Sequence, residues 1–292
     1  MARRKTDTRS IGLDVGLAFS RFLTGRENLH YGLWAEGMEV CAANLGAAQE
    51  AYTDKLFGLL PDRPGLRILD IGGGAGETAK KLVARGHSVD IVIPSPFLAE
   101  RCRENAGPTA RVHETRFEDF DTDARFDICL FSESFQYIPL DLALDKALSL
   151  LAPGGAVVIA DCFRTELIFE ETPYTKVGGG HLVTDFRQAL DARPLDILHD
   201  EDITAAVAPT VELEQALFNV IGYGLRRGHE GLAEGHPLLA GLLKRGAGLL
   251  LGRRRRERLD LRLNGKTRSV ETFCRYNRYL LLKLAPKEQA RP

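Results

Sequence analysis

A glycine-rich loop directly after an apolar strand pattern is the feature that most constrains this 292-residue chain. Arg67–Ile71 predicts a short buried strand, residues 72–76 carry four glycines, and a helical pattern follows over residues 76–85. Glycine lets the backbone turn sharply and approach a ligand closely, because it has no Cβ atom. The N-terminus of the next helix offers free N–H groups and the positive end of its dipole. The loop therefore predicts a site for a ligand that carries a carboxylate.

Short apolar strands alternate with helical patterns from residue 66 to residue 160. The predicted strands cover residues 67–71, 89–93, 110–114, 126–131 and 156–160. The predicted helices between them cover residues 76–85, 97–105 and 140–151. Apolar strands separated by helices are typical of a parallel sheet that is covered on both faces. The sequence thus predicts an α/β, doubly wound and mostly parallel sheet.

The flanking regions are mainly helical in pattern. Residues 1–10 are polar and are expected to be frayed, and residues 11–60 predict helices, since apolar side chains recur there every three or four positions. Beyond the core we expect a loop over residues 166–182 and helices at 183–191, 200–225 and 237–263, while residues 270–284 fit either a strand pair or a helix. We divide the chain into a lid (1–60), a ligand-binding core (61–165) and a substrate-binding, C-terminal basic region (166–292).

Composition excludes several classes of protein. The hydrophobic fraction of 44% and the charged fraction of 27% are ordinary for a globular chain. The five cysteines form no C-x-x-C pair, so we expect free thiols and no metal site. The N-terminus lacks the apolar run of a secretory signal, and about 18 uninterrupted apolar residues, as a membrane-spanning helix needs, occur nowhere. We expect a cytoplasmic protein.

Charge is divided unevenly along the chain. Residues 226–292 hold 17 Lys/Arg and 6 Asp/Glu, whereas residues 1–225 hold 22 and 34, which gives net charges of +11 and −12. A basic region of this kind indicates an anionic partner, such as an anionic membrane surface or an acidic acyl carrier protein. Nucleic acid ranks lower, because no known nucleic-acid module is present. A merely solvated basic face is the alternative.

Three motifs occur in a characteristic order between residues 55 and 162. They are Asp70-x-Gly72-x-Gly74-x-Gly76, the segment at residues 126–134, and Leu151-x-Pro153-Gly154-Gly155. In these motifs the chain resembles the class I S-adenosylmethionine-dependent methyltransferases. Residues 28–34, and the absence of an acidic residue at the end of the second strand, are further similar to their tocopherol-, sterol- and cyclopropane-type branches. The resemblance implies a Rossmann-like, seven-stranded sheet with an N-terminal helical lid and a mainly helical C-terminal addition. It also implies S-adenosyl-L-methionine as methyl donor and S-adenosyl-L-homocysteine as product.

The resemblance assigns donor-binding roles to individual residues. Asp70 would contact the ammonium group, and the loop glycines would line the methionine portion: Gly72, Gly73, Gly74 and Gly76. Ser132 and Glu133 would flank the sulfonium, and the adenine would lie by Phe117, Glu118 and Asp119. The family usually places an acidic residue at the end of the second strand, where it holds the ribose. This chain has Ile93 there, and we expect Ser95 to substitute for it.

The segment at residues 28–34 precedes the core and combines His30, Tyr31, Gly32 and the single Trp34. It is similar to the lid of small-molecule methyltransferases, which predicts that Tyr31 and Trp34 cover the donor; an ordinary helix start is the alternative.

Four side chains are candidates for polarising or deprotonating an acceptor: Tyr31, Glu133, Tyr137 and His181. The reaction we expect is methyl transfer to a carbon or oxygen of an apolar or lipid-like small molecule. A macromolecular acceptor (RNA or protein) and a non-catalytic, donor-binding scaffold are the rival hypotheses.

Overall fold

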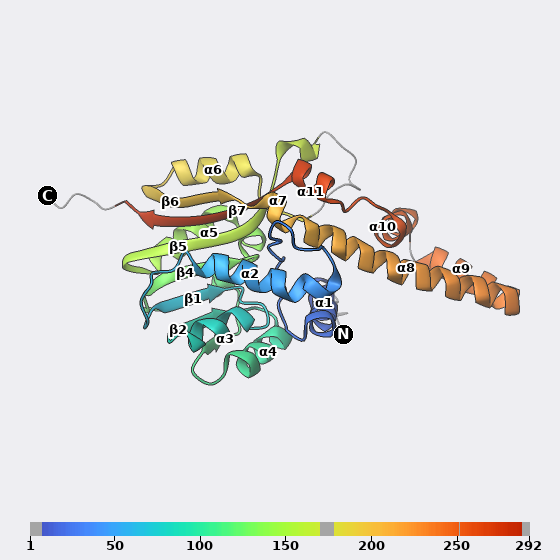
Figure 1. Cartoon of the computed structure of the whole chain (residues 1–292), viewed down its shortest axis with the longest axis horizontal. Helices are drawn as coiled ribbons and strands as arrows, with labels where there is room; N and C mark the ends of the chain where they lie inside the picture. Colours follow the sequence, from blue (N-terminus) through green and yellow to red (C-terminus); the bar gives the residue numbers. More distant parts are fainter. Residues whose placement is uncertain (1–7, 170–177, 251, 288–292) are drawn as a thin grey trace, which may run out of the picture.

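The computed structural model describes residues 8–169, 178–250 and 252–287, and a seven-stranded sheet lies at its centre (Figure 1). The strands are β1 Arg67–Ile71, β2 Ser88–Val92, β3 Arg111–His113, β4 Phe126–Ser132, β5 Leu151–Arg164, β6 Leu195–Asp202 and β7 Asn277–Pro286. Their order is β3-β2-β1-β4-β5-β7-β6, with β1 to β5 parallel and β7 antiparallel to both of its neighbours. The predicted doubly wound, mostly parallel sheet is confirmed.

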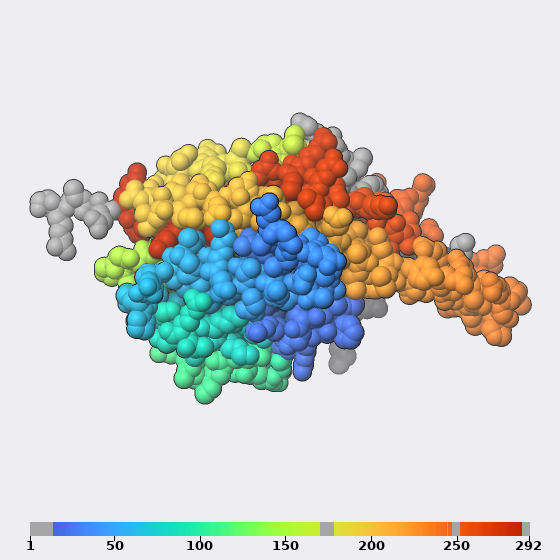
Figure 2. Space-filling view, in the orientation of Figure 1, coloured from blue at the N-terminus to red at the C-terminus, as the bar shows by residue number. Residues whose placement is uncertain are grey.

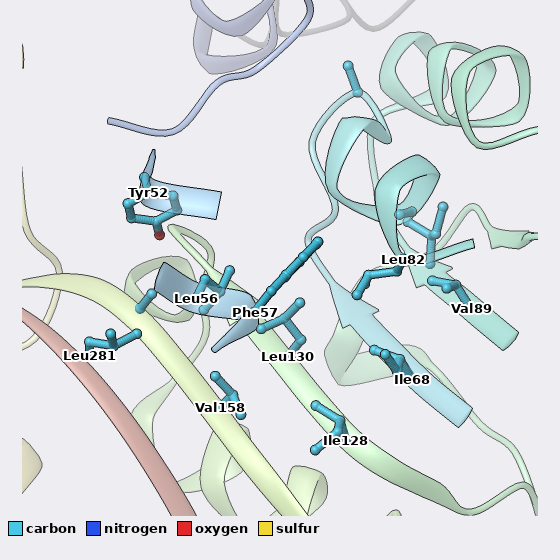
Figure 3. Close-up of a cluster of buried hydrophobic side chains, with 14 of the residues drawn as sticks. Tyr52, Leu56, Phe57, Ile68, Leu82, Val89, Ile128, Leu130, Val158 and Leu281 are labelled. Carbon is cyan, nitrogen blue, oxygen red and sulfur yellow. The ribbon is translucent and has the colours of Figure 1, made fainter. Parts of the chain in front are cut away.

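Helices cover both faces of this sheet because the side chains of each strand alternate between two apolar clusters. Ile68 belongs to one cluster and Leu69 to the other, and Leu130 and Phe131 repeat the pattern on β4. The first face carries α2 Leu45–Phe57, α3 Glu77–Ala84 and α4 Pro96–Ala106, while the second carries α5 Leu140–Ser149 and α6 Val183–Asp191. Figure 3 shows the first face, where Leu56 and Phe57 of α2 lie over Leu130.

The N-terminal part is helical only at its two ends. α1 spans Thr8–Thr24, and the 3₁₀ turn Ala42–Asn44 leads into α2. Residues 25–41 between them contain no helix, so the prediction of helices throughout residues 11–60 is wrong in this stretch. The prediction of fraying is wrong for residues 8–10, which begin α1, and its remainder lies outside the described residues. We call residues 25–34 the strap.

The region after residue 192 departs furthest from the prediction. Residues 195–202 form strand β6, where a helix was expected from residue 200, and the helices α7 Thr204–Val207 and α8 Pro209–Gly235 begin later. β6 is an edge strand that pairs only with β7, and Leu195 is its one fully buried residue. An edge strand with so little burial shows no apolar alternation, which is why the sequence pattern did not reveal it.

Two further segments refine the prediction for the C-terminal part. The helix expected over residues 237–263 is two helices, α9 Pro237–Leu250 and α10 Arg253–Asn264. Residues 270–284 hold a helix and then a strand, α11 Val270–Tyr276 followed by β7. The predicted loop at 166–182 begins with a 3₁₀ turn, Glu166–Phe169, and its residues 170–177 lie outside the described residues.

The helices α8 to α10 form an arm, residues 209–264, that projects away from the sheet (Figures 1 and 2). The arm leaves the sheet after β6 and the chain returns to it in β7. None of the described helices combines the length and the apolar character needed to cross a bilayer. The functional division of the chain at residues 60 and 165 stays a prediction.

Candidate active site

A cavity of about 490 Å³ opens at the carboxyl ends of β1, β2 and β4. The chain order along the sheet reverses beside β1, and ligands of open α/β sheets bind at such a switch point. Its walls come from the core and from the strap: residues 70–75, 77–78, 92–95, 98, 116–118, 132–134, 137–138 and 27–30. The volume suits a cofactor or another small molecule.

The glycine-rich loop forms one wall. Gly72 and Gly74 have φ angles of +77° and +56°, in the left-handed region that favours glycine. A Cβ atom on Gly72 would collide with Ser134, whose hydroxyl donates to the Ile71 carbonyl. A Cβ atom on Gly74 would meet only Leu29 Cδ1, at 3.8 Å, so this position faces open space. The loop therefore brings bare backbone to the cavity just before α3 begins.

Asp70 lies just before this loop, and one of its carboxyl oxygens lacks a hydrogen-bond partner among the described residues. The side chain is buried, and this oxygen is Oδ2. Burial raises the pKa of Asp70 to about 7, because the charged form loses its hydration. A buried, unpaired carboxylate is costly, and a cationic ligand group such as an ammonium would supply the missing partner. The site thus fits a ligand with an amino-acid end.

The wall after β2 carries no carboxylate. Ile93 and Ser95 line the cavity, as the sequence predicted for this position. Asp90 lies outside the lining and its Oδ1 is 2.7 Å from His113 Nε2. Ser95 caps α4, where its Oγ accepts from the Leu98 N–H at 3.3 Å. The cap uses a lone pair and leaves the hydroxyl hydrogen of Ser95 able to donate.

The wall after β3 combines an aromatic ring with charged groups. Phe117 and Glu118 line the cavity together with Arg116. The Phe117 ring packs edge-on against the Phe131 ring with centroids 5.8 Å apart, and this contact fixes the orientation of Phe117. Asp119 lies outside the lining and forms an ion pair with Arg116 at 2.7 Å.

Glu133 lines the cavity just after β4. Its φ of +57° makes it the one described non-glycine residue with a positive φ, and such strain concentrates at functional sites. Its Oε1 accepts from the Tyr31 N–H at 2.6 Å and from the Tyr279 hydroxyl at 2.9 Å. Burial raises the pKa of Glu133 to about 8. The carboxyl group is therefore held firmly and titrates near neutrality.

A chain of hydroxyl groups supports Glu133. The hydroxyl oxygens of Tyr279 and Tyr52 are hydrogen-bonded at 2.8 Å, and the Tyr52 hydroxyl is hydrogen-bonded to Ser132 Oγ at 3.1 Å. Because Tyr279 donates its hydrogen to Glu133, it accepts from Tyr52, and Tyr52 in turn accepts from Ser132. Burial raises the pKa of both tyrosines, so they stay protonated. Sequence reasoning missed Tyr52 and Tyr279, which lie outside the motifs.

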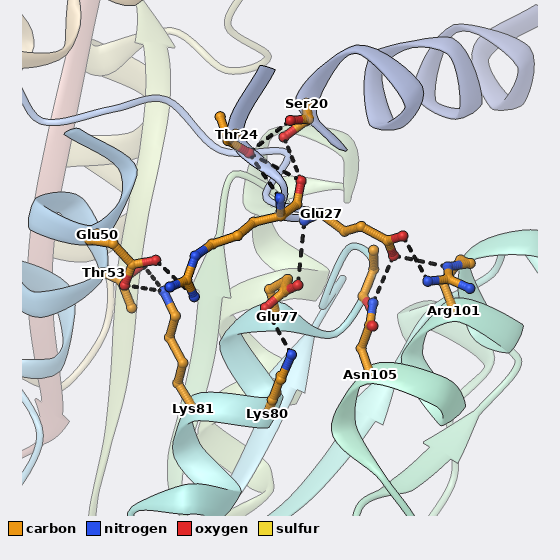
Figure 4. Close-up of polar contacts among 12 residues, drawn as sticks. Ser20, Thr24, Glu27, Glu50, Thr53, Glu77, Lys80, Lys81, Arg101 and Asn105 are labelled. Atoms are coloured by element: carbon orange, nitrogen blue, oxygen red, sulfur yellow. Dashed lines mark hydrogen bonds and ion pairs between the residues drawn. The ribbon is translucent and has the colours of Figure 1, made fainter. Parts of the chain in front are cut away.

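Hydrogen bonds and an ion pair hold the strap against α4 near its start and against α8 at its end. Glu27 pairs with Arg101 of α4 at 2.7 Å and accepts from Asn105 at 2.7 Å (Figure 4). Trp34 Nε1 donates to Thr210 Oγ1 at 2.9 Å. Gly32 permits close packing, since a Cβ atom there would lie 2.6 Å from Ala48 Cβ. These ties show how residues 27–30 are held across the cavity.

His30 is a cavity residue that the sequence analysis did not assign to the site, although it noted the segment. Its ring stacks on Tyr52 with centroids 4.4 Å apart, and its Nδ1 donates to the Tyr31 carbonyl at 2.8 Å. Burial lowers the pKa of His30 to about 4, so the ring is neutral at physiological pH. It contributes a flat, uncharged wall.

Five residues predicted for the site lie outside the cavity lining: Tyr31, Trp34, Gly76, Asp119 and His181. Tyr31 acts on Glu133 through its backbone, and Trp34 packs in the small core under the strap. Gly76 allows α3 to approach α4, since a Cβ atom there would lie 2.9 Å from Cys102 Cα.

His181 Nε2 donates to the Ile138 carbonyl at 2.9 Å, and its ring lies edge-on to Phe135. It thus fixes the loop that carries Tyr137, which does line the cavity. The described residues contain no group of three or more His, Cys, Asp or Glu side chains placed to hold a metal ion.

Comparison with known proteins agrees with this geometry. Residues 68–155 match the family described as "Methyltransferase domain". The chain is 32% identical over 146 residues to a 27-O-demethylrifamycin SV methyltransferase from Amycolatopsis mediterranei (strain S699). That match covers 46% of this chain and 51% of the relative, so the chain spans about half the length of this curated relative.

Solved structures share the whole fold. The cyclopropane synthase MmaA2 from Mycobacterium tuberculosis superposes with a TM-score of 0.67 at 17% identity, covering 97% of this chain and 99% of that one. A geranyl diphosphate C-methyltransferase from Streptomyces coelicolor A3(2) gives a TM-score of 0.61 at 15% identity, covering 93% and 92%. That protein was solved with Mg²⁺, geranyl-S-thiolodiphosphate and S-adenosyl-L-homocysteine.

Proposed function

We propose that this chain, a class I S-adenosylmethionine-dependent methyltransferase by its fold and its methyltransferase domain, methylates a carbon or an oxygen of an apolar or lipid-like small molecule. The observation that carries the proposal is the buried Asp70 carboxylate beside the glycine-rich loop, one oxygen of which has no hydrogen-bond partner in the part of the chain that the structure describes. An amino-acid-like ligand end satisfies Asp70 with its ammonium group and the start of α3 with its carboxylate.

S-adenosylmethionine, when bound, supplies a methyl group on a positively charged sulfur. The residues proposed to hold its amino-acid end are Asp70, Gly72, Gly73 and Gly74, all of which line the cavity. Ser95 offers a hydroxyl donor to the ribose, and Phe117 with Glu118 offers a flat apolar ring and a backbone edge to the adenine. Ser132 and Glu133 line the same cavity and are proposed to flank the sulfur.

Glu133 is the residue proposed to act on the acceptor. Its Oε1 already accepts two hydrogen bonds, so a proton on this carboxyl group resides on Oε2. With a pKa of about 8, Glu133 is mostly a hydrogen-bond donor at neutral pH and a base above it. Tyr137 lines the same cavity. In-line methyl transfer depends chiefly on alignment, which a rigidly held carboxyl group provides.

The apolar character of the cavity supports a small, apolar acceptor. Leu29, Ile71, Ile93, Leu98 and Ile138 contribute to its walls. The relatives point the same way, since one is named for a rifamycin substrate and another was solved with a geranyl compound. A macromolecular acceptor, RNA or protein, is the alternative, and a donor-binding scaffold is the third. An acyl carrier protein is a further candidate partner of the basic region.

The test combines purified protein, methyl-labelled donor and extracts of cellular small molecules, with mass spectrometry to find labelled products. We expect label in the organic-solvent fraction and none with Gly74→Val, which fills the donor loop. Label in RNA or protein would instead support the macromolecular alternative. Donor binding by calorimetry, with no label transferred to any fraction, would support the scaffold and contradict the proposal.

A further inference from the structure

The arm, residues 209–264, is built as a unit of three helices. α10 runs along α8, where Gln215 Nε2 donates to the Arg262 carbonyl at 2.9 Å and the Arg262 guanidinium lies 4.4 Å from the Phe218 ring centre. Arg226 donates to Asn264 at 2.9 Å on the same side. α9 packs against α8 as well, with Ala240 buried. These contacts give the arm a defined shape outside the sheet (Figure 1).

One side of α9 exposes leucines to water. Leu238 and Leu242 are 85% and 66% exposed, and Leu239 and Leu243 are 48% and 55% exposed. Pairs four positions apart lie one above the other, so the four side chains form one apolar stripe along the helix. α8 adds exposed apolar residues of its own: Val220, Tyr223 and Leu225. An exposed apolar stripe of this size indicates a binding surface.

Arginines adjoin this stripe in sequence. α10 begins with four consecutive arginines, and Arg254, Arg255 and Arg256 are exposed with no ion pair to a described residue. Arg253 is paired with Glu257 at 2.9 Å. Residues 236–264 hold 8 Lys/Arg and 2 Asp/Glu, so this part of the arm has a net charge of +6.

We propose that the arm docks the protein on an anionic bilayer, with the α9 leucines in the apolar boundary and the α10 arginines against lipid headgroups. Helices with a leucine-rich stripe and many Lys or Arg residues lie in this boundary region. α9 has 14 residues, about 21 Å at 1.5 Å per residue, which suits lying on a bilayer rather than crossing it.

A second copy of the chain fits the arm less well. Outside the arm, the exposed large apolar side chains of the described residues are scattered over α1, the segment before α2, α4, β6 and two 3₁₀ turns, so they offer no matching stripe. Two arms face to face would also bring their arginines together. A bilayer supplies both an apolar layer and a negative surface.

The docking itself is independent of the proposed function, but its benefit rests on that function. A protein docked on a bilayer would be close to a lipid-like acceptor dissolved in it. Each basic residue near an anionic surface contributes on the order of 1 kcal/mol, so three arginines could change binding by about 100-fold. The attraction weakens as salt shortens the Debye length. The leucine contribution, in contrast, should persist in high salt.

The experiment is co-sedimentation of the full chain with vesicles of phosphatidylcholine, alone or mixed with phosphatidylglycerol, at about 0.1 M and about 1 M salt. We expect binding to the mixed vesicles at low salt. The variant Arg254→Gln/Arg255→Gln/Arg256→Gln should lose at least about tenfold in binding. The variant Leu238→Ser/Leu242→Ser should lose the binding that survives high salt.

Matched controls carry equal changes outside the arm. Arg103→Gln/Arg111→Gln/Arg125→Gln removes three exposed arginines from the opposite part of the molecule, and Val40→Ser removes an exposed apolar side chain. Both controls should bind vesicles as the wild type does. Donor affinity, measured by calorimetry, should be unchanged in every variant, which separates failure of docking from failure of the methyltransferase proposal.

Three outcomes would overturn the docking proposal. One is wild-type protein that stays in the supernatant with mixed vesicles at low salt. Another is a wild-type dimer in light scattering that dissociates in the leucine variant without any vesicle binding, because the stripe would then serve a second copy. Equal loss in the arginine controls would also contradict it, since the effect would then be one of net charge alone.

Discussion

Two carboxyl groups line the cavity, and the protein holds them in opposite ways. Asp70 lies beside the glycine-rich loop, and its buried Oδ2 has no partner among the described residues. Glu133 lies beside tyrosines, and its Oε1 has two partners. Burial raises the pKa of both carboxyl groups, to about 7 and about 8.

This difference indicates which carboxyl group needs a ligand to complete its contacts and which one the protein already holds in place. An unpaired buried carboxylate gains most when a cation arrives, so Asp70 contributes to affinity. A carboxyl group that the protein already holds contributes to alignment instead, since its position does not depend on the ligand. Substitutions at the two carboxyl groups and at their neighbours separate these two contributions.

Gly74→Val should abolish donor binding, a loss of about 100-fold or more, or about 2.7 kcal/mol. The β-branched side chain must adopt a φ near +56° and would also enter the cavity. Calorimetry with S-adenosylhomocysteine measures the effect. Gly65→Val is the matched control, because Gly65 has a φ of +75° and no atom near its Cβ position. Similar affinity in the two variants would place the ligand elsewhere.

Asp70→Asn should weaken donor binding by about 10- to 100-fold, since a hydrogen bond to a charged group is worth about 1.5–3 kcal/mol. In the wild type, affinity should fall as pH drops below about 7, because the proton on Asp70 must leave before an ammonium can pair with it. Titration calorimetry over a pH series checks both.

The asparagine variant should lose this pH dependence. Asp90→Asn is the control, since Asp90 is a buried carboxylate on the neighbouring strand that pairs with His113 outside the cavity. If donor affinity still falls with decreasing pH in Asp70→Asn, the proton that binding displaces belongs to another group, and the role of Asp70 is disproved.

Tyr279→Phe should change the pH dependence of stability, by about 1 kcal/mol for one lost hydrogen bond. The folded pKa of Glu133, about 8, exceeds its ordinary value of 4.5, so the folded state binds the proton more tightly than the unfolded state. The free energy of unfolding therefore decreases as pH rises from about 4.5 to about 8.

Removing the Tyr279 hydroxyl takes a hydrogen bond from the ionised form, so the pKa of Glu133 should rise and the decrease should continue above pH 8. Urea unfolding between about pH 5 and about pH 9 measures it. Glu133→Gln is the reference, because it removes the titrating group. A variant whose profile merely shifts downward by a constant amount would show that Tyr279 is structural and does not position Glu133.

Trp34→Phe should have the smallest effect, a destabilisation of about 1 kcal/mol with unchanged donor affinity. Trp34 lies outside the cavity and its indole N–H donates to Thr210. Thr210→Val removes the acceptor and should cost more, because Thr210 Oγ1 also accepts from the Gly32 N–H at 3.0 Å. A large decrease in affinity with Trp34→Phe would restore the predicted contact between this residue and the donor.

Local sequence determined what could be foreseen. The helix predicted over residues 76–85 is α3, Glu77–Ala84. Of the predicted site residues, the cavity is lined by Gly72, Gly73, Gly74, Ile93, Ser95 and Phe117, among others. Each of these lies in a continuous stretch in which strand, turn and helix patterns follow one another.

What the sequence did not reveal depends on contacts between distant segments. Tyr279 and Glu133 are 146 positions apart, and only the antiparallel insertion of β7 beside β5 brings Tyr279 to the site. The edge strand β6 gave no apolar alternation, because one of its residues alone is fully buried. The prediction that Trp34 covers the donor came from the resemblance of its segment to the lid of small-molecule methyltransferases, yet in the fold its side chain packs in a small core with Leu45 and Ala48.

The position of the arm between two paired strands has an evolutionary consequence. β6 ends at Asp202, which lies opposite Leu280 near the start of β7, so the chain leaves and re-enters the sheet at neighbouring points. An insertion with adjacent ends can lengthen, shorten or be exchanged at little entropic cost, because loop closure depends only weakly on length. Selection can therefore remodel the surroundings in which such a catalyst works while the sheet and its cavity stay the same.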